Sequence, residues 1–439
     1  MPVNQTQLEE LDPRLRGEDN KSKCSVIPAQ AGIQDIYGKL IVLAEFGIEP
    51  QKTMIPRTIA PKILQYCKQY PVVTITGPRQ SGKTTLCKML FPDIPYISLE
   101  SIEERSFAAS DPKGFLDRFP DGAVLDEIQR TPDLLSYIQV RVDESQKSGQ
   151  FIITGSQNFE LLNTVSQSLA GRTAIARLLP FSFDEVLSQQ SLGSIDQLLY
   201  TGFYPRIYDK HLNPTEALSF YVNTYIERDL RLLINVKDLS RFETFLKLCA
   251  TRCGQVVNFS SLGNDCGVNH NTIKSWLSIL EASYIVKLLP PYYSSLGKRL
   301  FKAPKLYFID TGLAAFLLGI QNVEHVLAHP LRGGLFENMI VSEFLKKRFN
   351  KGKTDNLYYL RDSKGREVDI LLDYGAHLDM VEIKSGKTLA GDLFKGLLYF
   401  KNLYNQTRNC FIIYGGDLSR MQKDIQTVPW DTVASLEVE

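Results

Sequence analysis

The sequence predicts an α/β fold with a parallel β-sheet, followed by a mainly helical region and a second α/β unit. Short β-branched runs alternate with amphipathic segments over residues 71–155, a spacing typical of parallel sheets. Apolar residues then recur three and four apart over residues 221–253, which indicates helices. Further strand-like runs return after residue 356. With 439 residues, the chain is long enough for several domains.

Changes of pattern divide the chain into four predicted parts. Residues 12–34 are polar and without helical or strand period, so we expect residues 1–53 to be an extension. It is either a natural disordered tail or a spurious one, because DPRLRGEDN and SVIPAQAGIQ resemble peptides read from a bacterial intergenic repeat. We expect a sheet domain over 54–195, a helical lid and winged-helix region over 196–310, and a second α/β domain over 311–439.

Charge, cysteine content and hydropathy restrict the class of protein. Lys and Arg (50) nearly balance Asp and Glu (49), which gives no reason to expect a dedicated nucleic-acid or membrane binder. No apolar run approaches the roughly 20 residues of a membrane span. The seven scattered cysteines favour the reducing cytoplasm. Cys249 and Cys253 lie one helical turn apart, and we interpret them as small buried side chains rather than metal ligands.

A phosphate-binding loop follows the first apolar strand. The run GPRQSGKT matches the pattern G-x-x-x-x-G-K-[ST] between a strand and a helix, the context that this motif requires. Its amides and the helix N-terminus favour anions, and the lysine would reach the β- and γ-phosphates. The residues predicted to bind the nucleotide are Gly77, Pro78, Arg79, Gln80, Ser81, Gly82, Lys83, Thr84 and Thr85.

Two carboxylates stand at the end of a later apolar strand, AVLDE. Asp126 and the Thr84 hydroxyl are predicted to hold Mg²⁺. Asp126 would bind the ion through a water molecule. Glu127 is predicted to polarise the attacking water as a general base. An isolated LDE is common at strand ends, but the complete phosphate loop upstream strengthens this interpretation.

Two further residues have both catalytic and structural interpretations. Ser156 ends the strand FIITG and is placed to sense the γ-phosphate, or it forms a turn or helix cap. Arg172, in SLAGRTA, acts as an arginine finger or sensor from the same or a neighbouring subunit, or it makes a surface salt bridge. The neighbouring-subunit alternative implies a homo-oligomer.

Several motifs follow one another in a characteristic order: MIPR, GPRQSGKTTL, VLDEIQ, FIITGSQ, SLAGR, LLPFSFDE, GFYPR and YIERDL. In this order they resemble the bacterial and archaeal AAA-type ATPases whose C-terminal part is a domain of unknown function related to restriction endonucleases. The resemblance covers nearly everything from Met54 onward and implies an AAA+ core that binds ATP, a winged helix and a nuclease-like domain. Only the resemblance distinguishes ATP from GTP. GFYPR, where the family more often has two glycines, is a departure that leaves the ATPase assignment unchanged.

The last unit contains a possible second centre, similar to the PD-(D/E)XK nuclease core. Asp369 ends REVD, and Glu382 and Lys384 lie on one face of the next apolar strand. Asp369 and Glu382 would share a divalent metal, with Glu337 from the preceding helix completing the site. Lys384 would stabilise the attacking water or the developing charge on the phosphate. Alternatively, Glu382 and Lys384 form a charge pair on a solvated face.

A helix-turn-helix pattern precedes that unit and suggests contact with DNA. The segment FSSLGNDCGVNHNTIKSWL reads as two helices around a turn, with an apolar strand after them. Winged helices also serve as plain packing modules. The residues predicted to contact DNA are Asn269, Asn271, Thr272, Lys274 and Ser275 on the second helix and the basic stretch Lys298, Arg299, Lys302 and Lys305.

These patterns support three hypotheses of function. The first is a Mg²⁺-dependent ATPase that couples hydrolysis to rearrangement on DNA or on a protein partner. The second is a metal-dependent DNA nuclease that ATP regulates. The third is a nucleotide-gated binding switch with negligible turnover.

Overall fold

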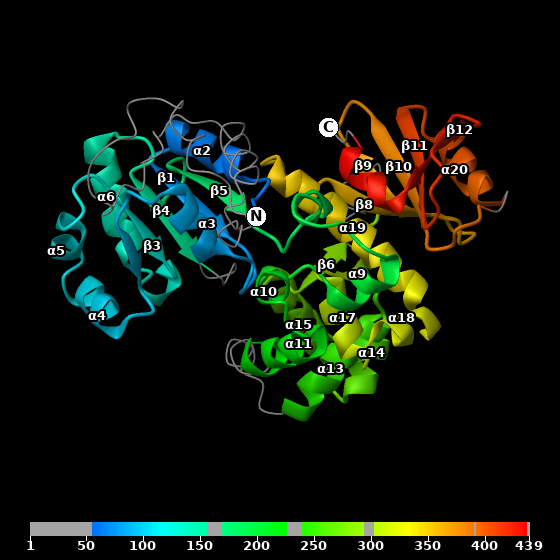
Figure 1. Cartoon of the computed structure of the whole chain (residues 1–439), viewed down its shortest axis with the longest axis horizontal. Coiled ribbons are helices and arrows are strands. Elements are labelled where there is room, and N and C mark those ends of the chain that lie inside the picture. The colour runs from blue at the N-terminus through cyan, green and yellow to red at the C-terminus, as the bar shows by residue number, and fades with distance from the viewer. Residues whose placement is uncertain (1–54, 156–167, 226–238, 294–302, 390–391, 437–439) are drawn as a thin grey trace, which may run out of the picture. The chain divides into compact units, whose positions relative to one another are not determined.

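The computed structural model describes residues 55–155, 168–225, 239–293, 303–389 and 392–436 (Figure 1). These residues belong to one unit that spans Ile55–Glu439. The extension expected over residues 1–53 lies outside the described residues. Within these ranges, no helix combines the length and the apolar character that crossing a membrane requires.

A five-stranded parallel sheet has the strand order β2-β3-β4-β1-β5, which confirms the predicted alternation of strands and helices. Because all strands run in one direction, their carboxyl ends meet at one edge, where open α/β sheets bind ligands. Strand β1, which lies between β4 and β5, leads into the phosphate loop at this edge. The strands are β1 (Val72–Thr76), β2 (Tyr96–Ser98), β3 (Ala123–Asp126), β4 (Phe151–Gly155) and β5 (Thr173–Arg177).

Helices cover both faces of this sheet because successive strand side chains point to opposite sides. Val72 packs in one core with Phe115 and Leu135, whereas its neighbour Val73 packs in another with Ile63 and Leu86. Both faces are therefore apolar, as parallel sheets require. The helical segments are α2 (Ala60–Gln69), α3 (Lys83–Leu90), α4 (Ile102–Ser110), α5 (Pro112–Asp117), η3 (Ile128–Arg130) and α6 (Leu134–Ser145).

A helical region follows and contains the expected helix-turn-helix. Its first helix, α14 (Phe259–Cys266), ends at Gly267, whose φ of 66° suits glycine. The second helix, α15 (His270–Ala282), precedes the antiparallel pair β6 (Val286–Leu289) and β7 (Lys305–Phe308). The other helices are α8 (Phe183–Leu187), α9 (Ile195–Thr201), α10 (Pro205–Lys210), α11 (Pro214–Tyr221), α13 (Leu239–Thr251), α17 (Thr311–Leu317) and α18 (Val323–Ala328).

The helical region extends beyond the boundary expected after residue 310. Helices α17 and α18 pack against α9, and α17 also packs against α11 and α13. Glycine allows this close approach, because a Cβ atom on Gly312 would lie 2.7 Å from the carbonyl oxygen of Thr201. Helices on both sides of residue 310 therefore pack together, and the domain boundary at 310/311 stays a prediction.

The C-terminal unit is a mixed six-stranded sheet with the strand order β12-β13-β11-β10-β9-β8. Side chains of β10 again alternate between two cores: Val381 packs with α19, and Met380 packs with α20. The helix and three strands expected here occur in the predicted order. The elements are α19 (Arg332–Asn350), β8 (Leu357–Arg361), β9 (Glu367–Asp373), β10 (Leu378–Lys384), α20 (Asp392–Leu403), β11 (Thr407–Tyr414), β12 (Arg420–Gln422), β13 (Ile425–Pro429) and η5 (Trp430–Ser435).

Candidate nucleotide-binding site

The loop Gly77–Thr84 connects β1 to α3 and depends on glycine at two positions. A Cβ atom on Gly77 would lie 2.0 Å from the carbonyl oxygen of Leu178, so no other residue fits there without a shift. Gly82, which precedes α3, has a left-handed φ of 91°. The loop backbone can thus turn its amides toward an anion at the start of α3.

Lys83 is the first residue of α3, and its side chain folds back over the loop. Its Nζ donates hydrogen bonds to the carbonyl oxygens of Gly77, at 3.0 Å, and Pro78, at 2.8 Å. Burial lowers the pKa of Lys83 to about 8, although Glu127 and Asp126 oppose this shift. A phosphate group would restore the charged form, because an anion compensates the desolvation that carbonyl groups compensate only in part.

Asp126 ends β3 beside this loop and accepts hydrogen bonds from three side chains. Its Oδ2 accepts a hydrogen bond from the Thr84 hydroxyl at 2.8 Å and another from the Tyr96 hydroxyl. Thr154, on the neighbouring strand β4, donates to Oδ1. The hydroxyl of Thr84 and the carboxylate of Asp126 are hard oxygen donors. This pair fits Mg²⁺, which commonly takes one or two protein oxygens and completes its shell with phosphate and water.

Glu127 follows Asp126 in a conformation that is unusual for a residue with a side chain. Its φ of 60° and ψ of 46° are left-handed, a strain of about 1 kcal/mol that is typical of functional sites. Its amide donates to the hydroxyl of Thr154 at 3.4 Å, and Gln129 donates a side-chain hydrogen bond to its Oε2. Through Thr154, which also donates to Asp126, the backbone of Glu127 is linked to the same hydrogen-bond network.

Arg57 supports the phosphate loop from the opposite side, a role that sequence reasoning missed. Its Nη1 donates to the carbonyl oxygen of Ser81 at 2.6 Å, and its Nη2 donates to that of Leu179 at 2.5 Å. Its Nε lies 3.1 Å from Glu185 Oε1, and its guanidinium lies over the ring of Phe181. The motifs MIPR and LLPFSFDE contain the two members of this ion pair, Arg57 and Glu185. Their joint occurrence was the signal that the sequence offered for this contact.

The two residues with alternative interpretations have different outcomes. Ser156 lies outside the described residues, and Thr154 is the polar side chain of β4 that contacts Asp126. Arg172 precedes β5 at the edge where the strands begin, while the phosphate loop lies where they end. It forms a bidentate pair with Asp143, with distances of 2.6 and 2.8 Å. The structure thus shows the salt bridge that was the structural alternative for Arg172. A catalytic role, in the same subunit or across a subunit boundary, stays a prediction.

Comparison with known families agrees with this geometry. Residues 69–187 match the model of an AAA domain. This part of the chain is therefore similar to P-loop ATPase domains of the AAA type. Residues 192–324 match a domain of unknown function, DUF8612, and residues 332–433 match another, DUF4143. The nuclease relationship expected for the last unit is not part of that match.

Similar proteins occur in mycobacteria and among solved structures. The chain is 29% identical over 338 residues to uncharacterized proteins of Mycobacterium bovis (Mb2031c) and Mycobacterium tuberculosis (Rv2008c), with 76% of this chain and 74% of each relative covered. The Walker-type ATPase PABY2304 of Pyrococcus abyssi is 14% identical, covers 61% of this chain and 99% of its own, and has a TM-score of 0.42. AMPPCP-bound DnaA from Aquifex aeolicus is 15% identical, covers 51% and 86%, and has a TM-score of 0.26.

The residues of the expected nuclease-like centre are near one another but do not form the expected metal site. Lys384 Nζ pairs with Glu382 at 2.9 Å, whereas Glu337 and Asp369 are bridged by a different lysine, Lys305. Among the described residues, no group of three or more His, Cys, Asp or Glu side chains has an arrangement that could hold a metal ion. The expected metal shared by Asp369, Glu382 and Glu337 is therefore corrected to a carboxylate cluster that contains a lysine.

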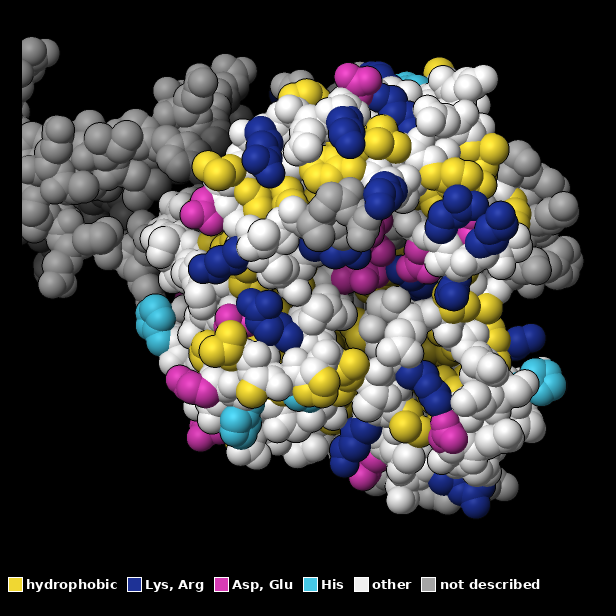
Figure 2. All heavy atoms as spheres, turned by 90° about the vertical axis from the view of Figure 1, so that its right-hand side faces the viewer, with side chains coloured by type: hydrophobic (Ala, Val, Ile, Leu, Met, Phe, Trp, Pro, Cys, Tyr) yellow, Lys and Arg dark blue, Asp and Glu magenta, His cyan; other side chains and the backbone are white. Residues whose placement is uncertain are grey.

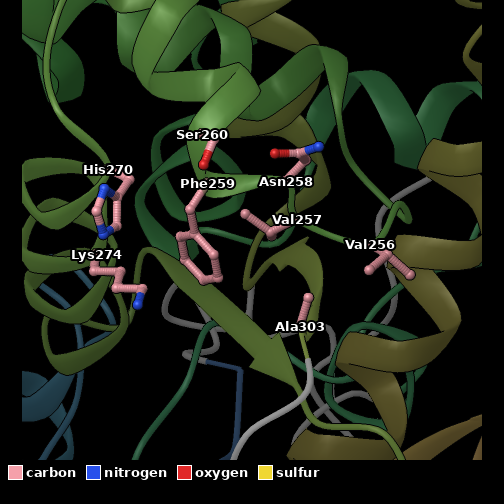
Figure 3. Close-up of a pocket in the computed structure, with 8 residues that line it drawn as sticks. All are labelled: Val256, Val257, Asn258, Phe259, Ser260, His270, Lys274 and Ala303. Atoms are coloured by element: carbon pink, nitrogen blue, oxygen red, sulfur yellow. The ribbon is translucent and has the colours of Figure 1, made fainter.

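The residues proposed to contact DNA differ in their surroundings. Asn269 caps α15 by accepting hydrogen bonds from the amide and hydroxyl of Thr272 at 2.8 and 3.1 Å. Lys274 lies beside Phe259 in an open hollow of about 450 Å³ (Figure 3). Lys305 is buried and so is unavailable to DNA, which corrects its place in the basic stretch. Asn271 and Ser275 are exposed. Lys298, Arg299 and Lys302 lie outside the described residues.

Basic side chains do not gather into a stripe on the face that Figure 2 shows. Among the described residues there, Lys and Arg are interspersed with acidic and apolar side chains. A nucleic-acid contact on this face would have little of the electrostatic footprint that phosphate backbones favour.

Proposed function

We propose that the protein is a Mg²⁺-dependent ATPase that hydrolyses ATP at the loop Gly77–Thr84. The observation that carries the proposal is the contact between Thr84 and Asp126 beside the buried ammonium of Lys83. It brings a metal-ligand pair and a phosphate-binding cation to one edge of the parallel sheet. The preference for ATP is supported by the AAA-domain match.

The residues of the site divide the work of phosphoryl transfer. Lys83 would exchange its two carbonyl partners for phosphate oxygens and so balance their charge. Glu127, at the end of β3, would accept a proton from the attacking water. Mg²⁺ bound through Thr84 and Asp126 supplies further charge neutralisation. Tyr96 and Thr154 position the Asp126 carboxylate for this role.

Contacts beyond the sheet domain suggest how nucleotide state could reach the rest of the chain. A Cβ atom on Gly82 of the phosphate loop would lie 3.9 Å from Pro205, the first residue of α10. From the C-terminal helix α19, Lys346 donates to the carbonyl oxygen of Phe181 at 2.8 Å. Glu343 on the same helix accepts a hydrogen bond from the amide of Phe183. We propose that hydrolysis rearranges these units on DNA or on a protein partner.

One observation favours a second candidate, the nucleotide-gated switch with negligible turnover. Gln129 holds the Glu127 carboxylate, so the general base is restrained before it can take a proton. In such a protein ATP binding, rather than hydrolysis, would set the state of the helical region. A nuclease regulated by ATP has less support, because Lys305 lies among the carboxylates that a metal would need.

The decisive experiment measures Mg²⁺-dependent phosphate release from ATP, with and without duplex or branched DNA. Lys83→Ala and Glu127→Gln are the test variants, and Lys68→Ala, at an exposed lysine of α2, is the matched control. The ATPase proposal expects turnover in the parent and control, and loss in both test variants. ATP binding without turnover in the parent would overturn it and favour the switch. Stimulation by DNA would identify the partner class.

A further inference from the structure

The side chain of Lys305 lies where three elements of the C-terminal half meet. It belongs to β7, the second strand of the pair that follows the helix-turn-helix. Glu337 approaches from α19, and Glu367 and Asp369 approach from β9. Only 3% of the Lys305 side chain is exposed. A lysine so deeply buried needs compensating charge, and these carboxylates provide it.

The contacts of the Lys305 ammonium resemble the surroundings of a bound cation. Its Nζ lies 3.0 Å from Glu337 Oε1 and 3.5 Å from Asp369 Oδ1, and it also pairs with Glu367 Oε1. The remaining bonds hold these carboxylates in place. The Tyr307 hydroxyl donates to Glu337 Oε1 at 2.5 Å, and the amide of Ile383 donates to Asp369 Oδ2 at 2.8 Å.

The electrostatics of the cluster agree with this geometry. Burial alone would lower the pKa of Lys305, but Glu337, Asp369 and Glu367 raise it above its usual value, so the ammonium stays charged. Burial and then Asp369 raise the pKa of Glu337 to about 7. The carboxylates therefore repel one another, and Lys305 is the buried cation that contacts both Glu337 and Asp369. Arg361, which is half exposed, lies 3.7 Å from Glu367.

The geometry points to Lys305 as a built-in cation that closes this carboxylate cluster against divalent metal ions and fastens β7 to the C-terminal sheet. A metal ion and the lysine would need the same oxygens of Glu337 and Asp369. While β7 packs against the C-terminal sheet, Lys305 occupies the cluster and excludes a metal ion. If β7 moved away, the carboxylates would become available to a metal ion. Lys305 is thus a lock between the helical region and the last unit, and it acts independently of the nucleotide site.

Binding of Mn²⁺, followed through the electron paramagnetic resonance signal of the free ion, tests this lock on the full chain without nucleotide. Lys305→Met removes the internal cation, and Lys384→Met removes a more exposed lysine near the same carboxylates. Asp369→Asn, added to either variant, identifies binding at the cluster rather than at Asp126.

We expect Lys305→Met to increase Mn²⁺ affinity at the Asp369-dependent site at least about tenfold, because a full positive charge leaves the cluster. The parent and Lys384→Met should show no such site. An Asp369-dependent site already present in the parent would overturn the lock, as would a folded Lys305→Met variant that gains none. If Lys305→Met does not fold, the double variant Lys305→Met/Glu367→Gln, which keeps the cluster's net charge, is measured in its place. An Asp369-dependent site in the parent, or a folded double variant that gains no such site, would again overturn the lock.

Discussion

Two buried lysines, Lys83 and Lys305, show how different surroundings give one side chain different roles. Lys83 donates to two carbonyl oxygens of its own loop, and burial lowers its pKa to about 8, although Glu127 and Asp126 oppose this shift. Lys305 contacts carboxylates from α19 and β9, and its pKa is raised. The first lysine lacks a full counter-charge, whereas the second already has an excess of it.

The difference separates a site that awaits an anion from a cluster that is already neutralised. Carbonyl partners can be exchanged for phosphate oxygens at low cost, because they carry only partial charges. Carboxylate partners cannot be given up without leaving buried charge unpaired. Lysine burial alone therefore does not identify a functional site; the charge of its neighbours does.

The largest expected effect is on ATP turnover. Lys83→Ala should reduce the rate of phosphate release by at least about a hundredfold, because it removes the cation that contacts the transferred phosphate. Lys305→Met should leave this rate within about twofold of the parent, since no phosphate contact is lost. Steady-state phosphate release from both folded proteins is the measurement. Equal loss in both variants would contradict the separation of the two lysines.

Stability should show the opposite order. Lys305→Met should lower the free energy of unfolding by about 3 kcal/mol, because it leaves buried carboxylates without their cation. The matched Lys384→Met variant should cost less than about 1 kcal/mol, since that lysine is 40% exposed. Urea denaturation followed by tryptophan fluorescence would measure both. Similar losses in the two variants would mean that the burial of Lys305 among its carboxylates does not increase its contribution to stability.

The pH dependence of ATP binding should also distinguish Lys83 from Lys305. The free site loses its ammonium charge above a pKa of about 8, and a bound triphosphate restores it. ATP affinity should therefore fall about tenfold from pH 7 to pH 9, with uptake of a proton at the higher pH. Calorimetry in buffers of different ionisation enthalpy measures that proton. Affinity that stays constant over this range would show that Lys83 remains charged in the empty site.

The smallest effect is expected at an exposed ion pair. Arg172→Ala removes a pair with Asp143, whose side chains are 32% and 46% exposed. The free energy of unfolding should fall by less than about 1 kcal/mol, as for other surface pairs. Turnover should not change in dilute, monomeric protein. A large loss of turnover that appears only at concentrations where the protein self-associates would instead support a role for Arg172 across a subunit boundary.

Local sequence was sufficient for the features that depend on neighbouring residues. The glycines and lysine of Gly77–Thr84 and the acids of Asp126–Glu127 could be recognised because one strand and one turn position each group. Alternating apolar runs also predicted the parallel sheet, and the turn at Gly267 separated the two helices of the helix-turn-helix. In these cases backbone geometry follows from side chains only a few positions apart.

Tertiary structure alone decided which distant charges meet. The motif that contains Arg57 does not by itself show that this side chain supports Ser81, and nothing near Lys305 indicates that it enters the cluster around Asp369. As a result, Lys305 was assigned to a basic surface and Asp369 to a metal. Charged side chains show no periodicity that reports burial, so their partners become known only when strands and helices from separate segments pack together.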